Sequence, residues 1–243
     1  MKLHVVKDSV EGSKKAADLI KNIIEEKNDA VLGLATGSTP IEMYKNLIEM
    51  YNNGEISFKD VKTINLDEYL GLAGDHEQSY RYFMDENLFN HVDINKDNTV
   101  VPNGLAEDYD QHVADYEAMI DSLGGQDCQV LGVGVNGHIG FNEPGEKLEL
   151  KTHVEDLTES TIEANKRFFE SANDVPKKAI SMGIGSIFKA KKILVLAFGE
   201  TKADAIKALE DSKITTMIPV TLLKLHPDVT VIVDEAAASK LNK

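Results

Sequence analysis

One segment of this 243-residue sequence combines glycine, asparagine, histidine and glutamate in a way that suits proton transfer. It spans residues 131–145 and continues an apolar run. Its many glycines favour close backbone approach over helix or strand formation. His138 is the side chain suited to moving a proton near neutral pH, and Asn136 and Glu143 are near enough in sequence to orient its ring. We therefore expect a functional histidine here, although an isolated buried histidine is more commonly structural.

Two consecutive carboxylates, Asp67 and Glu68, follow a second apolar run, Val61 to Leu66. A carboxylate at the end of a buried strand is well placed to act as a general base. An acidic residue in this position also commonly caps the next helix, so that a cap without any catalytic role is the alternative. The residue types and their spacing leave both roles open.

A third segment, Gly33 to Pro40, has the features of a phosphate site. Its hydroxyl groups would meet the free N–H groups at the start of a helix predicted from Ile41. We expect Thr39 to be the N-cap of that helix and Pro40 its first residue. The segment has neither the Gly-Lys-Ser/Thr of a P-loop nor the glycine spacing of a dinucleotide-binding turn. The residues expected to hold the phosphate are Thr36, Gly37, Ser38 and Thr39.

Two basic residues, Lys202 and Arg167, are candidates for binding an anion on a chain whose net charge is −15. Lys202 falls in the first turn of a predicted helix, where a positive charge opposes the helix dipole. An anion bound beside it would relieve that conflict. Arg167, judged from its spacing alone, is expected to be an exposed arginine on a helix face. Residues 151–175 around it have a polar, helix-like pattern and are a candidate lid.

The elements that must position these residues follow from hydrophobic patterning. Six apolar runs bounded by Gly, Asn or Asp predict buried strands, and stretches of helical period lie between them. Such alternation predicts an α/β fold, a single doubly wound domain over residues 1–243 with a mainly parallel sheet flanked by helices, Rossmann-like in type. Ligands of such sheets bind beyond the carboxyl ends of the strands. The predicted strands are Ala30–Ala35, Val61–Leu66, Cys128–Val135, Lys178–Met182, Ile193–Phe198 and Val229–Val233, and the helical stretches include Ile41–Tyr51, Tyr116–Ile120 and Ala203–Leu209.

Composition excludes several classes of function. The chain carries 26 basic and 41 acidic residues, so it lacks the positive field that attracts nucleic acid. The sequence has no run of about 18 apolar residues, so it predicts neither a membrane span nor an export signal. The single cysteine, Cys128, cannot form an intramolecular disulfide, and no His/Cys cluster has the spacing of a zinc site. We expect a cytoplasmic protein without a structural metal.

With these residues laid out, the sequence resembles the glucosamine-6-phosphate deaminase family, aldose–ketose isomerases that also release ammonia. The resemblance covers nearly the whole chain, and its most specific part is Phe141 to Pro144. The related 6-phosphogluconolactonases share a similar phosphate turn and a Gly-His element but lack this glutamate. The matching segments are Gly33–Pro40, Asn65–Tyr69, His76 with Ser79-Tyr80, Gly134–Gly145, Ala164-Asn165 with Arg167–Phe169, and Gly199 with Lys202.

The resemblance implies a role for each matching residue. Asp67 would take the C2 proton of the opened sugar and return it at C1, while His138 would assist ring opening. Asn136 and Glu143 would orient and tune His138. The phosphate would sit on Gly37, Ser38 and Thr39, with Arg167 and Lys202 closing over it. The reaction implied is conversion of glucosamine 6-phosphate and water to fructose 6-phosphate and ammonia, which needs no metal or other cofactor.

The sequence departs from the family pattern in two places. Many members carry aspartate where this chain has Asn136, which can accept a hydrogen bond from the imidazole but supplies no charge to stabilise its protonated form. Allosterically activated members hold an effector phosphate with basic residues after the glutamate, whereas the stretch Glu146 to Asp156 is mostly acidic here. We therefore expect no such activation. The sequence leaves the oligomeric state open.

Two other functions compete with the deaminase. A 6-phosphogluconolactonase-like sugar-phosphate hydrolase would use the phosphate turn and a histidine without C–H proton transfer, and Asp67 together with Glu143 argues against it. A non-catalytic sugar-phosphate-binding protein is the alternative from another class. A DNA-binding regulator is disfavoured, because a strand-like segment already begins by about residue 3 and is expected to leave no room for a DNA-reading domain. Turnover of substrate distinguishes the enzyme from the binding protein.

Overall fold

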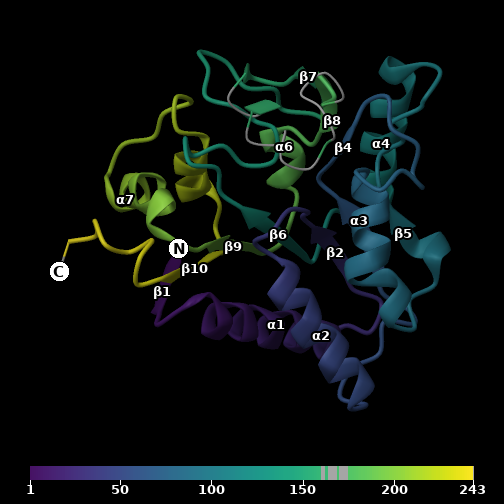
Figure 1. Cartoon of the computed structure of the whole chain (residues 1–243), viewed down its shortest axis with the longest axis horizontal. Coiled ribbons are helices and arrows are strands. Elements are labelled where there is room, and N and C mark those ends of the chain that lie inside the picture. Colours follow the sequence, from purple (N-terminus) through teal and green to yellow (C-terminus); the bar gives the residue numbers. More distant parts are fainter. Residues whose placement is uncertain (160–161, 164–168, 170–174, 243) are drawn as a thin grey trace.

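A wholly parallel sheet of seven strands forms the centre of the molecule (Figure 1). The computed structural model describes residues 1–159, 162–163, 169 and 175–242. The strand order is β1-β10-β9-β6-β2-β3-β5. The strands are β1 (Lys2–Val6), β2 (Val31–Leu34), β3 (Lys62–Asn65), β5 (Thr99–Val100), β6 (Cys128–Gly132), β9 (Ile193–Ala197) and β10 (Val229–Asp234).

This strand order contains a reversal beside β2. The chain runs outward from β2 through β3 to β5, and then returns to the opposite side of β2 as β6. Connections therefore leave in opposite directions from the carboxyl ends of β2 and β6. In open α/β sheets such a reversal leaves a crevice in which ligands bind.

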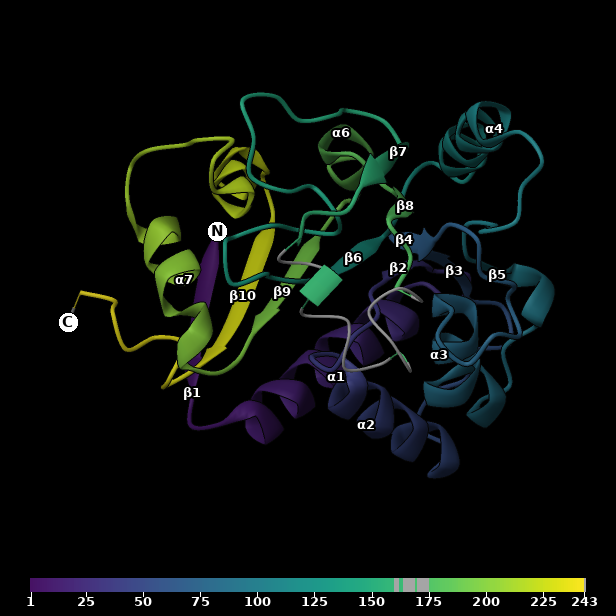
Figure 2. The same cartoon turned by 45° about the horizontal axis from the view of Figure 1, so that its top comes forward.

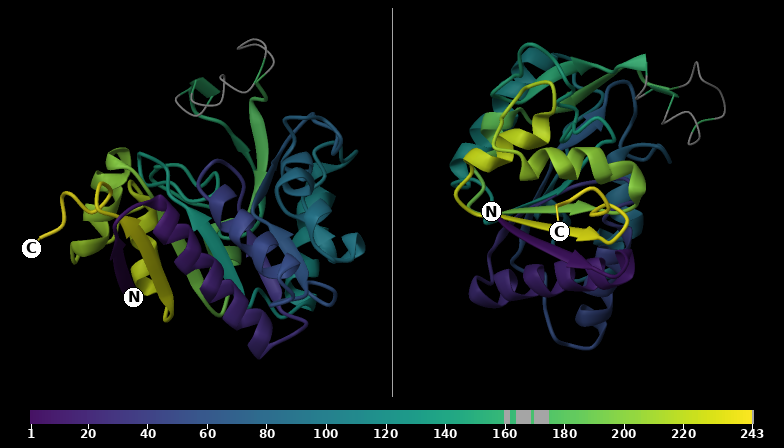
Figure 3. Two further views of the ribbon diagram at one scale, coloured as in Figure 1. Left: turned by 60° about the horizontal axis from the view of Figure 1, so that its bottom comes forward. Right: turned by 90° about the vertical axis from the view of Figure 1, so that its left-hand side faces the viewer.

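Helices cover both faces of the sheet, as the alternation of strands and helices predicted. One face packs on α1 (Ser9–Glu26), α2 (Ile41–Asn52) and α3 (Tyr80–Asn87). The other packs on α4 (Tyr109–Ser122), α6 (Ile184–Ile187), α7 (Ala203–Glu210) and the 3₁₀ helix η6 (Pro219–Leu225). Figure 3 shows α1 and α7 on opposite sides of β9 and β10. Shorter 3₁₀ turns are η1 (Phe89–His91), η2 (Lys96–Asn98) and η5 (Glu200–Lys202).

The core explains why the central strands are continuous apolar runs. Leu194 and Leu196 of β9 lie in the apolar cluster beneath α1 and α2, whereas Ile193 and Val195 lie in the cluster beneath α7 and η6. Each of these side chains is buried. A strand buried on both faces shows no alternation of polar and apolar residues, which is the pattern of parallel sheets.

A second, antiparallel sheet stands apart from the first. It has the order β4-β8-β7, with β4 (Asp67–Tyr69), β7 (His153–Asp156) and β8 (Lys178–Ser181). β4 and β8 lie side by side (Figure 2), and Asp67 is paired with Ser181. The run Lys178–Met182 was expected to belong to the parallel sheet, and this expectation was wrong. A short apolar run indicates burial but does not specify the partner strand, because pairing is decided by residues distant in sequence.

The start of α2 also differs from the expectation. The first residue of the helix is Ile41, and Pro40 is its N-cap, whose carbonyl accepts the Tyr44 N–H at 2.9 Å. Thr39 is therefore not the N-cap, and no side chain caps this helix end. Pro40 has a helical backbone conformation already, so the helix begins one residue later than the capping pattern suggested.

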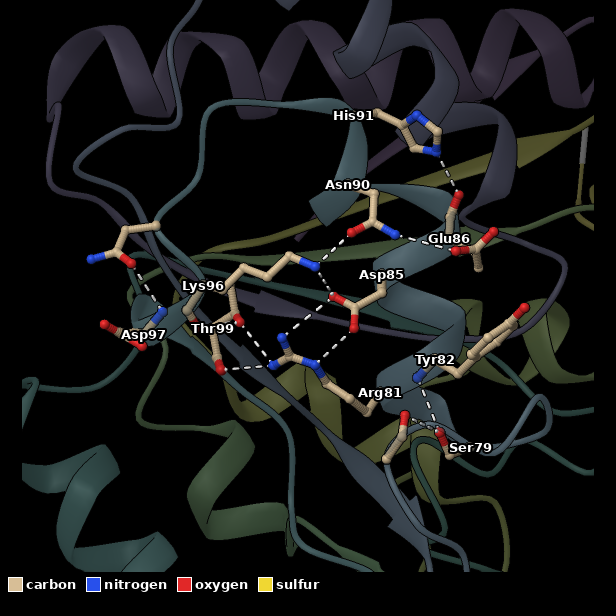
Figure 4. Close-up of polar contacts among 12 residues, drawn as sticks. Ser79, Arg81, Tyr82, Asp85, Glu86, Asn90, His91, Lys96, Asp97 and Thr99 are labelled. Carbon is tan, nitrogen blue, oxygen red and sulfur yellow. Dashed lines mark hydrogen bonds and ion pairs between the residues drawn. The ribbon is translucent and has the colours of Figure 1, made fainter.

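Arg81 ties α3 to the far edge of the parallel sheet (Figure 4). Its guanidinium donates to the Asp85 carboxylate at 3.2 and 3.3 Å and to the Thr99 carbonyl and hydroxyl at 3.1 and 2.9 Å. Lys96 adds a second cation, 3.2 Å from Asp85. This network fixes α3 against β5.

Two further expectations concern residues 151–175 and membrane association. Much of the candidate lid, including Arg167, lies outside the described residues. Within the part of the chain that the structure describes, no helix has the length and apolar character needed to cross a membrane.

Candidate active site

The four chemistry-bearing turns predicted from the sequence follow adjacent strands. The strands are β9, β6, β2 and β3, which are consecutive in the sheet and parallel. Their carboxyl ends consequently share one edge. The turns are residues 199–203, 133–145, 35–40 and 66–69, and two of them follow β6 and β2, the strands on either side of the reversal.

The turn after β2 has the form of an anion site. Gly37 has a positive φ of 88°, which favours glycine, and Gly37 and Ser38 are exposed. The Tyr44 hydroxyl donates to the Ala35 carbonyl at 2.6 Å and anchors the start of the turn. Because no side chain caps α2, the first N–H groups of this helix are open to a ligand together with the hydroxyls of Thr36 and Thr39.

Lys202 lies at the end of η5, directly before α7, and is partly buried. Burial lowers the pKa of its ammonium group. Among the described residues, no carboxylate lies within ion-pair distance of it. The preceding turn is held by Asp234, whose two oxygens accept the Gly199 N–H at 3.0 and 2.9 Å. A fixed, partly desolvated cation without a counterion is suited to binding an anionic substrate.

Asp67 is buried, with 7% of its surface exposed. Burial, with a smaller contribution from the neighbouring Glu68, raises the pKa of its carboxyl from 3.8 to about 8. No donor in the described ranges is within hydrogen-bond distance of its oxygens. A Cβ at Gly140 would lie 3.8 Å from Oδ2 of Asp67, so the glycine leaves space beside this oxygen. Asp67 is therefore a strong base whose lone pairs are not used by the fold.

Glu68 has the other role considered from the sequence, that of a helix cap. Its carboxylate accepts the N–H groups of Tyr80 and Arg81, the first two residues of α3, both at 2.9 Å. It also accepts the N–H of Tyr69 at 2.8 Å. Glu68 therefore has the capping role, and Asp67 stays the candidate for the general base.

The loop after β6 arranges His138 beside a carboxylate. Nδ1 of His138 lies 3.3 Å from Oε1 of Glu143, at ion-pair distance but without hydrogen-bond geometry. Nδ2 of Asn136 donates to the other Glu143 oxygen at 2.8 Å. Oδ1 of Asn136 accepts the backbone N–H of His138 at 3.1 Å. The side-chain carbonyl of Asn136 thus closes the turn, and its amide group holds the carboxylate that lies beside the imidazole.

Glycine is required directly beneath the imidazole. A Cβ at Gly134 would lie 2.3 Å from both Cε1 and Nδ1 of His138. Gly137, with a φ of 85°, completes the turn, and its N–H donates to the Gly134 carbonyl at 3.0 Å. The ring can occupy its position only because residue 134 has no side chain.

The antiparallel sheet joins this loop to Asp67. Oγ of Ser181, the β8 residue paired with Asp67, accepts the N–H of Phe141 at 3.0 Å. Nδ2 of Asn142 donates to the Met182 carbonyl at 2.8 Å and to the Ile139 carbonyl at 2.9 Å. The end of β8 therefore holds both β4, which carries Asp67, and the loop that carries His138.

Sequence reasoning did not single out Ser181 or the individual glycines at 134 and 140. The polar end of an apolar run, Ser181 after Lys178 to Ile180, was the available signal for the serine. Glycine spacing marked the loop but not which glycine meets the ring. The described residues contain no group of three or more His, Cys, Asp or Glu arranged to hold a metal ion.

Known proteins resemble this chain over nearly its whole length. A family model described as glucosamine-6-phosphate isomerases/6-phosphogluconolactonase matches residues 9–232. A glucosamine-6-phosphate deaminase of Thermoanaerobacter pseudethanolicus is 59% identical over 98% of this chain and 94% of that protein. One of Clostridium perfringens is 59% identical over 99% of this chain and 100% of that protein.

Solved structures agree with this match. A structure described as a monomeric glucosamine-6-phosphate deaminase superposes with a TM-score of 0.96 at 45% identity, covering 98% of this chain and 99% of that one. A 6-phosphogluconolactonase from Thermotoga maritima has a TM-score of 0.74 at 21% identity, covering 96% and 98%. The second likeness concerns the fold alone.

We predict that Gly134→Ala displaces the His138 ring and lowers turnover by about 100-fold or more, in the range of a lost acid–base group. The ring lies at the mobile end of a side chain, so the variant should still fold. Gly132→Ala is the matched control, because a Cβ there meets no atom within 4 Å. Steady-state kinetics of the two variants, with circular dichroism to verify folding, test the prediction. Equal activities would show that the contact at Gly134 does not position the ring.

We also predict that Asp67→Asn stabilises the protein above about pH 4. Between pH 3.8 and about 8 the unfolded chain releases a proton that folded Asp67 keeps, so the free energy of unfolding falls as pH rises. Asparagine removes this loss, and the gain should grow to the order of 3–5 kcal/mol near pH 8. Urea unfolding at several pH values measures it, with the exposed Asp75→Asn as control. If the free energies of unfolding of Asp67→Asn and the parent differ by the same amount at every pH, the raised pKa of Asp67 is contradicted.

Proposed function

The chain belongs to the glucosamine-6-phosphate isomerase/6-phosphogluconolactonase family, and we propose that it converts glucosamine 6-phosphate and water to fructose 6-phosphate and ammonia. Relatives 59% identical over nearly the full length are named as deaminases of this substrate. The chemistry required is proton transfer next to a masked carbonyl, and the site has a base, a histidine and an anion-binding turn at one sheet edge.

Asp67 is proposed to move the proton between carbon atoms. Once the pyranose ring is open, the carboxylate takes the proton from C2, which the neighbouring aldehyde acidifies. The same carboxyl returns the proton to C1. The C1 oxygen gains a proton as the amine nitrogen loses one, so that C1 becomes a hydroxymethyl group and the amine carbon becomes an imine. Water adds to that imine, and ammonia leaves with formation of the ketone. One buried acid–base group suffices for both transfers, because C1 and C2 are adjacent.

His138 is proposed to open the ring. Its imidazole exchanges a proton between the C1 hydroxyl and the ring oxygen, which exposes the aldehyde. Glu143 lies 3.3 Å from Nδ1 and is held by Asn136, so it orients the ring. Nε2 is the nitrogen left for the sugar.

The phosphate end of the sugar is proposed to bind between the turn after β2 and the start of α7. Thr36, Gly37, Ser38 and Thr39 would provide hydroxyl and backbone N–H donors. Lys202 would supply the charge, and its desolvated ammonium group would regain a partner. Arg167 remains part of this proposal from the sequence alone, because it lies outside the described residues.

The observation that carries the proposal is the buried Asp67 carboxyl with no hydrogen bond from the described residues and a pKa raised to about 8. A hydrolase that opens a lactone adds water to a carbonyl and has no C–H bond to break, so it does not need a base that takes a proton from carbon and returns it to carbon. The second carboxylate, Glu143 beside His138, belongs to the segment in which the sequence departs from the lactonases.

Activation by an effector phosphate bound to residues 146–156 is not part of the proposal. Nε2 of His153 is paired with Glu155 at 3.2 Å, and Asp156 with Lys178 at 3.2 Å. These acidic side chains would repel a phosphate.

We expect the purified protein to release ammonia and fructose 6-phosphate in equal amounts from glucosamine 6-phosphate, measured by coupled assays. Asp67→Asn should lower turnover by about 100- to 10,000-fold while substrate still binds, because the substitution keeps the shape and removes the proton acceptor. Lactone hydrolysis without ammonia release would contradict the proposed reaction. Near-normal turnover of Asp67→Asn would instead remove only Asp67 from the mechanism.

Lys202→Ala should weaken use of the phosphorylated sugar specifically. Loss of a charge-assisted contact worth about 1.5–3 kcal/mol predicts a fall in kcat/KM of roughly 10- to 150-fold for glucosamine 6-phosphate. Residual activity on unphosphorylated glucosamine should change little. Lys207→Ala on α7, whose ammonium group is paired with Glu210, is the matched control. Equal losses on the two sugars would argue against a phosphate contact.

A further inference from the structure

Glu68 is a buried carboxylate for which the proposed reaction has no use. Only 1% of its surface is exposed. It alternates with Asp67 along β4, so the two side chains leave the strand toward opposite faces. Glu68 is directed to α3, whereas Asp67 is directed to the turn at Gly140. Two carboxylates are therefore buried one residue apart.

The first turn of α3 holds the Glu68 carboxylate. The N–H groups of Tyr80 and Arg81 bind its two oxygens, and the next N–H, that of Tyr82, binds the Ser79 hydroxyl at 3.0 Å (Figure 4). Three donors of the helix N-terminus are thus used by two side chains. The partial positive charge of the helix end also favours the ionised form of Glu68.

Among the residues that the structure describes, no cation neutralises Glu68. Arg81 offers its backbone N–H, but its guanidinium is turned to Asp85 and Thr99 (Figure 4). In the portion of the chain that is described, Glu68 takes part in no ion pair. Its negative charge therefore acts on its surroundings without screening by a partner side chain.

Two ionisable groups near the pair are the phenols of Tyr80 and Tyr116. Burial raises the pKa of Tyr80 and of Tyr116 well above the ordinary value, so both stay neutral, and Asp67 contributes to both shifts. Tyr69 on β4 packs its ring 4.7 Å from that of Tyr80. On the loop side, the charged groups are His138 and Glu143, which face each other.

From this geometry we propose that Glu68 is a positioning residue that sets the proton affinity of Asp67. The inference rests on the proposed role of Asp67 as the base. The first turn of α3 fixes a negative charge one residue from Asp67, and that charge opposes the ionisation of Asp67. The same contacts hold α3 and β4 together, so charge and placement come from one side chain.

Electrostatics supports the proposal and explains why a raised proton affinity of Asp67 serves the reaction. Burial raises the pKa of Glu68 to about 7 against the effect of its three backbone donors, while burial and Glu68 raise that of Asp67 to about 8. Two such neighbours release their protons as a coupled pair. A raised pKa makes the Asp67 carboxylate a stronger base toward a carbon acid and favours its keeping the proton until it is returned to C1.

The test compares pH profiles of Glu68→Gln and Ser79→Ala. Glutamine removes the charge and keeps one acceptor for the helix, so the acid limb of kcat/KM should move to lower pH by about one unit or more. The high-pH plateau of kcat should fall about three- to tenfold with KM nearly unchanged, because the base is weaker. Ser79→Ala weakens the same helix end without changing a charge, so its acid limb should stay with the parent.

Each outcome decides the proposal. A shift of the acid limb in Glu68→Gln but not in Ser79→Ala supports the proposal. An unmoved limb in Glu68→Gln, or equal shifts in both variants, would overturn it, the second result showing that helix placement and not charge is responsible.

A second measurement applies even where Glu68→Gln fails to fold. Coupling between two carboxyls is reciprocal, so removing the Asp67 charge should lower the pKa of Glu68. The Glu68 carboxyl carbon can be followed by NMR in ¹³C-glutamate-labelled parent and Asp67→Asn. An equal Glu68 pKa in both would overturn the proposal. This readout needs no turnover, so near-normal activity of Asp67→Asn would refute the catalytic role of Asp67 separately.

Discussion

Burial of two consecutive carboxylates, neither of them paired with a cation among the described residues, is the constraint on which the site depends. In the unfolded chain water solvates both carboxylates, and folding removes most of that water from both. For Glu68 the loss is offset by three backbone donors and the start of α3. For Asp67 no described residue offsets it, and the pKa of its carboxyl rises to about 8. The fold thus keeps one carboxylate as a structural cap and leaves the other reactive, at a cost in stability that is typical of functional sites.

Placement of that reactive group depends on the small antiparallel sheet. β4 leaves the parallel sheet after β3 and pairs with β8, whose Ser181 also binds the loop that carries His138. Asn142 fastens the same loop to Met182. Asp67 and His138 come from segments about 70 residues apart in sequence. Their relative position is set by one strand, so neither depends on a long flexible connection.

The parallel sheet supplies the opposite end of the site. Its reversal beside β2 places the turn at Gly37 and the loop at His138 on either side of one crevice, and β9 brings Lys202 to the same edge. The chain is strongly acidic, with a net charge of −15. An anionic substrate is therefore attracted by a local cation and free helix N–H groups and not by the protein as a whole.

The sequence by itself determined the local features of this protein. Five of the six predicted strands lie in the parallel sheet, and the four candidate turns follow adjacent strands, because apolar runs and helical periodicity are properties of neighbouring residues. The resemblance to the family also came from the sequence. Only the tertiary structure decided that Lys178–Ser181 joins a second sheet, that Glu68 and not Asp67 caps α3, and that Asn136 holds Glu143. These outcomes depend on which donors and strands meet in three dimensions, and no local pattern specifies partners distant in sequence.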